Sequence, residues 1–186
     1  MDYRRFRVSA PDRRPLLMFI QEALERCGCS LLNASAPNEA PFRLTFEAPD
    51  GERMGILVYA FLANSRTTRN RPSDEHRFQL KYGSNDGELH VLWQDPFQLY
   101  TTLLVGINPD LGFFVGADPL HHSPTRFFIS IEFKDRDVRA ILADGWAFWG
   151  RATGRGGIDQ PIELMVGGRA ESFLRYVRFE RAAKGL

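Results

Sequence analysis

The sequence predicts an α+β fold in which a mainly antiparallel, curved sheet or pseudo-barrel is flanked by helices. Between residues 42 and 133, apolar residues either alternate or form short runs bounded by Gly, Pro, Asn and Asp, as is typical of strands. Before and after this region, apolar residues recur at helical spacing. The 186 residues are enough for a substantial core, and we expect 1–186 to form a single domain.

The first predicted element is a helix over residues 12–27. Asp12 is a typical N-cap residue, apolar residues follow at helical spacing, and Gly28 ends the run. Residues 33–41 are rich in Ala, Pro, Ser and Asn, which predicts a loop before the sheet begins.

The sheet is predicted over residues 42–133. Its expected strands are Phe42–Glu47, Met54–Ala63, His76–Tyr82, Leu89–Trp93, Tyr100–Ile107, Phe113–Ala117 and Phe127–Phe133. The clearest pair is the hairpin around residues 108–112, Asn-Pro-Asp-Leu-Gly, because its Pro and Gly supply turn geometry between two apolar strands.

The end of the chain, residues 135–184, predicts the order helix, strand, helix. The expected elements are a helix that Asp135 caps and that ends near Gly145, a packed segment Trp146–Trp149, a strand Ile162–Val166 and a helix Ala170–Ala183.

Composition narrows the class of protein. No apolar run approaches the length of a membrane span, and the N-terminus lacks the apolar core of a signal peptide. The two cysteines, Cys27 and Cys29, lie too close for an ordinary disulfide, so we expect a reduced, cytoplasmic protein.

The charge is unevenly distributed, although the net charge is only +1. Residues 64–83 hold five Lys or Arg against two Asp or Glu, whereas residues 84–125 hold none against five. A polarised molecule of this kind steers polyanions. An ordinary mixed, solvated surface is an equally good interpretation of the charges.

Residues 64–71 place three arginines among Asn, Ser and Thr side chains. Such a density of planar guanidinium and amide donors is typical of sites that hold a phosphate or a polyanion. Asp74 and Glu75 follow directly, and we expect them either to act as paired acids or to fix the segment by ion pairs. The residues predicted to contact DNA are Asn64, Arg66, Arg69, Asn70, Arg71 and Arg77.

A catalytic alternative uses Asp118 at a strand end with Glu132 and Lys134 on the next strand. These are the ingredients of a PD-(D/E)xK nuclease, in which the acids hold Mg²⁺ and the lysine helps to activate water. The pattern is short and degenerate, and the usual Pro-Asp order is reversed to Asp118-Pro119. Mg²⁺ is the cofactor of this alternative alone, and no other cofactor or metal site is expected. The pair His121-His122 predicts solvated side chains, since neighbours on a strand point to opposite faces.

Three aromatic residues are candidates for a pocket that holds a modified or flipped base. Trp93, Tyr100 and Trp146 lie near predicted bends with polar neighbours, and aromatic rings stack readily on exposed bases. The alternative is that these rings belong to the core.

Several segments together resemble the N-terminal domain of prokaryotic restriction endonucleases, spanning roughly residues 42–180. They are Ile56–Phe61, the motif Arg-Pro-Ser-Asp-Glu-His-Arg-Phe-Gln at residues 71–79, the hairpin Leu103–Asp118 and Ser130-Ile131. The family pattern of the motif is RPxDE-aromatic-R-aliphatic-Q, and this chain has His76 and Phe78 at the two variable positions.

The resemblance implies a DNA-recognition module joined to a separate HNH or PD-(D/E)xK nuclease domain. Its arginine segment would hold phosphates and its aromatic pocket would read a modified base. The resemblance implies double-stranded DNA as the partner and no association with a membrane. It is compatible with a homodimer and with a fused or separate nuclease domain. A nuclease using Asp118, and a protein-interaction domain without a nucleic-acid role, remain the two alternatives.

Overall fold

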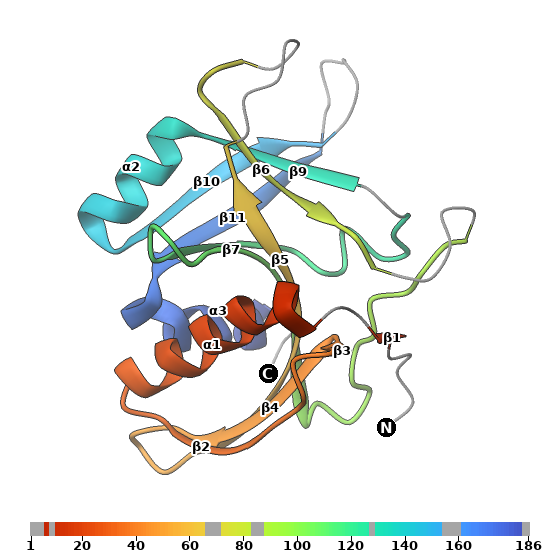
Figure 1. Cartoon of the computed structure of the whole chain (residues 1–186), viewed down its shortest axis with the longest axis vertical. Coiled ribbons are helices and arrows are strands. Elements are labelled where there is room, and N and C mark those ends of the chain that lie inside the picture. Colours follow the sequence, from red (N-terminus) through yellow and green to blue (C-terminus); the bar gives the residue numbers. More distant parts are fainter. Residues whose placement is uncertain are drawn as a thin grey trace.

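The computed structural model describes residues 6–7, 10–65, 72–82, 88–126, 129–153 and 161–183 (Figure 1). The helices are α1 (Ala10–Arg26), α2 (Asp135–Asp144) and α3 (Phe173–Ala183), the last preceded by a 3₁₀ turn, Ala170–Ser172. The strands are β1 (Phe6–Arg7), β2 (Ser30–Ala34), β3 (Glu39–Ala40), β4 (Phe42–Glu47), β5 (Arg53–Asn64), β6 (Glu75–Leu80), β7 (Tyr100–Asn108), β8 (Phe113–Ala117), β9 (Ile129–Lys134), β10 (Trp146–Ala152) and β11 (Ile162–Arg169). No helix among these residues is long and apolar enough to cross a membrane.

The α+β prediction is confirmed. Nine of the described strands form one mixed, mostly antiparallel sheet, and its main path runs β10-β11-β8-β7-β5-β4-β2. Strand β6 leaves this path by pairing with the end of β5, and β9 pairs with β6. The sheet is not closed into a barrel, so of the two predicted forms the open, curved sheet is the one observed.

Strand β5 is the centre of the fold. It pairs in antiparallel with β4 over Arg53–Val58, and in parallel with β7 over Gly55–Leu62. Its last two residues pair with β6. Successive side chains alternate between two cores: Ile56 and Val58 face the helices α1 and α3, whereas Leu57 and Tyr59 face β6, β9 and α2 (Figure 1). Burial on both faces explains why this strand reads as a continuous apolar run.

Two glycines let aromatic rings lie directly on the sheet. A Cβ atom at Gly116 of β8 would lie 2.3 Å from the ring of Tyr176 on α3, and one at Gly106 of β7 would lie 2.3 Å from the ring of Phe78 on β6. Tyr176 is fully buried and its hydroxyl donates to the carbonyl oxygen of Leu104 at 3.2 Å. Burial raises the pKa of Tyr176 well above its ordinary value, so the hydroxyl keeps its proton.

The cysteines lie directly after the end of α1. The Cys27 thiol donates to the carbonyl oxygen of Glu171 at 3.3 Å and accepts the backbone N–H of Leu174 at 3.4 Å, which links α1 to α3. Burial, reinforced by Cys27, raises the pKa of the Cys29 thiol to about 11. Both cysteines are free thiols.

Three predicted elements are wrong in detail. Residues 30–34 form the edge strand β2, whose first four residues are exposed and therefore carry no apolar alternation. The segment from Trp146 is a strand, so two strands follow α2 where one was predicted, and the sheet extends beyond residues 42–133 to both sides. Residues 89–93 alternate in burial, but they form only a single bridge, between His90 and Thr125.

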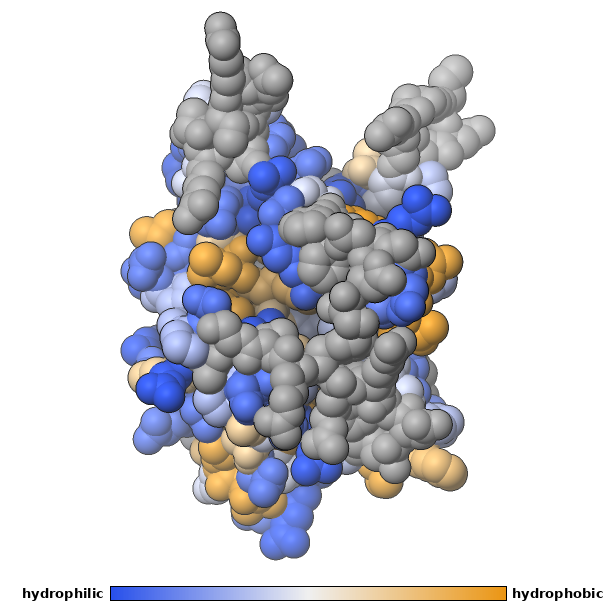
Figure 2. Space-filling view, turned by 45° about the vertical axis from the view of Figure 1, so that its right-hand side comes forward, coloured by the Kyte–Doolittle hydropathy of each residue, from blue (hydrophilic) through white to orange (hydrophobic). Residues whose placement is uncertain are grey.

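Large apolar side chains remain exposed in several places. They include Phe97, Leu99, Phe148 and Ile162, each at least 70% exposed. In Figure 2, hydrophobic residues form separate orange groups divided by blue hydrophilic residues. The described part of this face is therefore mixed in polarity.

Candidate functional site

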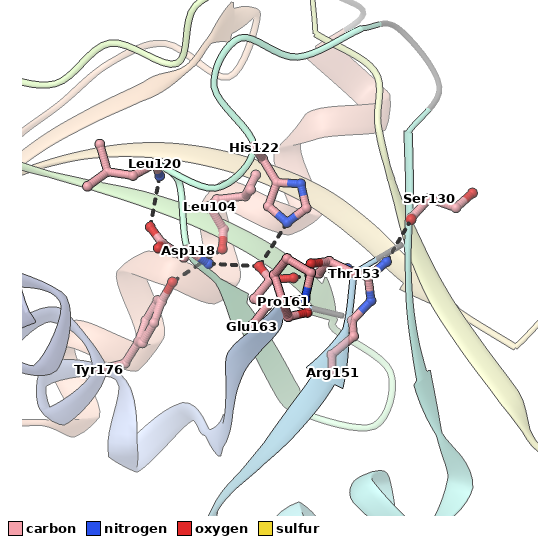
Figure 3. Close-up of polar contacts among 10 residues, drawn as sticks. All are labelled: Leu104, Asp118, Leu120, His122, Ser130, Arg151, Thr153, Pro161, Glu163 and Tyr176. Carbon is pink, nitrogen blue, oxygen red and sulfur yellow. Dashed lines mark hydrogen bonds and ion pairs between the residues drawn. The ribbon is translucent and has the colours of Figure 1, made fainter. Parts of the chain in front are cut away.

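A buried carboxylate, Glu163 of β11, is the centre of the most elaborate polar cluster among the described residues. Its side chain is 0% exposed. One carboxylate oxygen lies 2.8 Å from Nε2 of His122 and accepts the backbone N–H of Asp118 at 3.2 Å. The other accepts Nη1 of Arg151 at 2.9 Å (Figure 3). A buried charge is costly unless it is paired and hydrogen-bonded, and here both oxygens have partners.

The electrostatics of this cluster favour the ionised carboxylate. Burial by itself raises the pKa of Glu163, but the hydrogen bonds and positive charges of His122 and Arg151 more than offset this effect. The pKa of Glu163 consequently lies below its ordinary value. The cluster is built to hold a negative charge inside the protein at neutral pH.

Local structure brings the three side chains together. Arg151 of β10 is the direct cross-strand partner of Glu163 in β11, so the register places the two charges opposite each other. His122 arrives from the connection after β8, where the carboxylate of Asp118 accepts the backbone N–H of Leu120 at 2.8 Å and tightens the turn. The loop that carries His122 is thereby fixed onto the β10–β11 hairpin.

The cluster extends to the strands that carry the motif at residues 71–79. Nη2 of Arg151 donates to the carbonyl oxygen of Ser130 on β9 at 3.4 Å. The Ser130 hydroxyl accepts from Arg77 at 3.5 Å and from Gln79 at 3.4 Å, both on β6. These contacts are long and therefore weaker than those of Glu163. The connected set, called the polar seam below, consists of His122, Glu163, Arg151, Ser130, Arg77 and Gln79.

A second polar cluster joins the turn before β6 to the start of α2. Nζ of Lys134 lies 3.3 Å from the carboxylate of Asp74, and Nε2 of His76 lies 2.5 Å from that of Asp135. The backbone N–H of Asp135 also donates to the carbonyl oxygen of Asp74 at 2.9 Å. The Asp137 carboxylate accepts the backbone N–H of Lys134 at 2.8 Å and so caps α2. Asp74 thus fixes this turn by an ion pair, as one of the two hypotheses for it proposed.

Comparison with known families gives the context of this site. A family model described as Methylase-associated X1 matches residues 54–177, about two thirds of the chain. The chain belongs to this family. The matched region extends from β5 to α3 and contains every residue of the polar seam. No significant match exists among curated proteins or solved structures.

Membership of the Methylase-associated X1 family indicates a restriction-modification or other DNA-modification context. The motif at residues 71–79 also led us to expect a restriction system, so the two observations agree on this context. The match does not extend to the N-terminal domain of a restriction endonuclease, so that narrower resemblance is not carried forward as a finding.

Some of the predicted DNA-contacting residues lie within the described part of the chain, and others lie outside it. Arg66, Arg69, Asn70 and Arg71 lie outside the described residues. Asn64 and Arg77 are cross-strand partners where β5 meets β6. The chain enters the arginine-rich segment from β5 and leaves it toward β6, and these two strands pair with each other. Contact of the segment with DNA stays a prediction.

The residues of the nuclease alternative are engaged by different partners. Asp118 closes its own turn, Lys134 pairs with Asp74, and Glu132 is exposed on β9 opposite Arg77. Within the described ranges, no group of three or more His, Cys, Asp or Glu side chains lies close enough to hold a metal ion. A catalytic role for the three residues stays an untested alternative.

The aromatic candidates lie in different parts of the fold. Trp93 packs against the core under β6 and β9, whereas Trp146 packs against the core under α1 and α3, with the guanidinium of Arg175 4.3 Å from its ring centroid. Strand register places Trp146 level with Ile107 of β7, seven residues from Tyr100. Seven residues of strand span roughly 23 Å, so Trp146 and Tyr100 do not line one pocket.

Sequence reasoning missed the Glu163 cluster. Its three side chains come from separate segments, and the adjacent His121 suggested a solvated pair. The structure corrects this for His122, which is buried against Glu163. The available signal was a lone Glu within an otherwise apolar strand, Ile162–Val166, since a buried acid needs a cation nearby.

Proposed function

We propose that this chain is a DNA-recognition module of a restriction-modification or phage-defence system, acting beside a DNA methylase or a nuclease. The observation that carries the proposal is the position of the arginine-rich segment, which is inserted between two paired strands in a domain of a methylase-associated family. In the proposed module the segment contacts backbone phosphates, and neighbouring side chains read base edges or a modified base.

The flanking structure supports different roles for Arg77 and for the arginines that precede it. Arg77 donates to Ser130 within the polar seam and is half-buried, so its role is to hold β6 against β9. Arg66, Arg69 and Arg71 are then the residues proposed to contact phosphate. Guanidinium groups suit this task because they keep their charge and bind phosphate oxygens bidentately.

The proposal is tested by binding to labelled duplexes, measured by fluorescence anisotropy at about 50 and 200 mM salt. Replacing Arg66, Arg69 and Arg71 together by Ala is expected to weaken binding by tens of fold. The slope of log K against log salt should fall by about 2.7, because each lost phosphate contact removes roughly 0.9. Plain, methylated and hydroxymethylated duplexes should bind with different affinities if a modification is read.

The matched control replaces Arg26, Arg53 and Arg181 by Ala. It removes the same charge from exposed or half-exposed side chains, and Arg53 lies at the opposite end of β5 from Asn64. The control variant should bind within about twofold of wild type, since it loses only long-range charge that salt screens. Equal binding by wild type and the Arg66, Arg69 and Arg71 variant at low salt would refute the proposal.

A further inference from the structure

A charged groove lies between the turn before β6 and the first turn of α2. It is open to solvent, has a volume of about 360 Å³ and is lined by Asp74, Lys134, Asp135, Arg136 and Arg139. Nothing in the polar seam or in the predicted DNA-contacting set uses the two arginines of this groove. The groove therefore requires its own interpretation.

The acids of the groove are already engaged within the protein. Asp74 pairs with Lys134 at 3.3 Å, and Asp135 lies 2.5 Å from Nε2 of His76. Asp137, beside the groove, accepts the backbone N–H of Lys134 and lies 3.5 Å from Nε of Arg136. A negatively charged ligand consequently meets carboxylates whose charge is compensated by neighbouring donors.

The two arginines are exposed to solvent, although Arg136 also pairs with Asp137 at its Nε. The Arg136 side chain is 78% exposed, and Arg139 is exposed as well. Residues three apart on a helix lie on the same face, so both arginines lie on the same side of α2. The five lining residues carry three positive and two negative charges, and Asp137 beside them supplies a third negative charge. What the groove offers a phosphate is therefore two exposed, forked donors of the kind that bind phosphate oxygens.

We propose that this groove binds a backbone phosphate of duplex DNA through Arg136 and Arg139, which rests on the proposed function and extends its contact surface onto α2. The connection is the chain itself: Asp74 lines the groove and follows Arg71 by three residues. Three residues span at most about 11 Å. The groove and the end of the arginine-rich segment are therefore close enough to contact one stretch of backbone.

The test compares four proteins in the same anisotropy assay with an unmodified duplex. They are wild type, the Arg136→Ala/Arg139→Ala variant, the Arg136→Lys/Arg139→Lys variant and a control, Arg26→Ala/Arg53→Ala. The alanine variant should bind about tenfold more weakly, with a salt slope lower by about 1.8, since two phosphate contacts are lost. The lysine variant should recover part of the affinity, because lysine keeps the charge without the fork. The control should change by less than twofold.

Superimposable thermal melting curves would show that the exposed substitutions leave the fold intact. If the Arg66, Arg69 and Arg71 variant loses affinity while the Arg136/Arg139 variant behaves like its control, this inference is wrong and the proposed function stands. If wild type binds no duplex at about 50 mM salt, both are wrong. Binding of inorganic phosphate that is lost in the alanine variant, together with a duplex affinity that phosphate does not reduce at constant ionic strength, would assign the groove to a free phosphate and overturn its assignment to DNA.

Discussion

Replacing Glu163 by Ala is expected to lower the free energy of unfolding by about 3–5 kcal/mol, because the largely buried Arg151 loses its counter-charge and the buried His122 loses its hydrogen-bond partner. For a chain of this length, such a loss lowers Tm by roughly 6–20 °C. Urea denaturation at pH 7 measures the free energy directly. The loss is large because three elements meet at this carboxylate: the loop after β8, β10 and β11.

The matched control is Glu132→Ala, which removes an exposed carboxylate from β9 and should change stability by less than about 0.5 kcal/mol. Glu163→Gln should fall between the two, since it keeps the shape and an acceptor but loses the charge. Equal stabilities of the Glu163→Ala and Glu132→Ala proteins would show that the buried cluster contributes nothing.

The same carboxylate predicts how stability depends on pH. The pKa of Glu163 is lower in the folded protein than the value of about 4.3 expected in the unfolded chain. Its contribution is therefore complete above about pH 4.3 and is lost as the pH falls through the folded-state pKa. The stability difference between wild type and Glu163→Gln should shrink below about pH 4. A difference that stays constant from pH 7 to pH 3 would contradict the proposed ion pairing.

The second large effect is expected from Gly116→Val, which should cost about 3 kcal/mol or prevent folding. The first atom of any side chain at this position would lie 2.3 Å from the Tyr176 ring, which is fully buried and hydrogen-bonded to Leu104. Neither the strand nor the helix can withdraw, because Gly116 pairs with Val105 on one side and Val166 on the other. Thermal melting of the variant measures the loss.

A double-mutant cycle isolates the steric cause. Gly116→Ala and Tyr176→Leu should each destabilise the protein, and the double variant should be more stable than the sum of the two losses predicts, because the smaller residue relieves the clash. Strictly additive losses would mean that the close approach of Tyr176 to β8 is not what limits this position.

Alternation predicted strands well wherever one face of the strand is buried and the other is half-exposed. Phe42–Glu47 and Glu75–Leu80 show this pattern in the structure, and their sequences alternate accordingly. The hairpin around residues 108–112 was predicted because its Pro and Gly act locally. By contrast, the strand from Trp146 has intermediate and exposed residues without a clear apolar period, so only its pairing with β11 defines it.

The site could be predicted only where its residues are neighbours in sequence. Arginines clustered at residues 64–71 are visible in the sequence itself, and so is the motif that follows them. The ion pair of Arg151 with Glu163 depends on strand register, and the contact with His122 depends on the path of a loop. The parallel pairing of β5 with β7 was likewise unpredictable, because the described residues between them, 65, 72–82 and 88–99, include no helical crossover to signal it.

The central position of β5 makes the two cores interdependent. Its side chains alternate between them, and β7 beside it does the same with Leu103 and Leu104. Removing α1 and α3 would expose one apolar face of this strand pair to water, and removing β6, β9 and α2 would expose the other. Neither layer can detach at low energetic cost, so the surface that carries the arginine-rich segment shares the stability of the whole molecule.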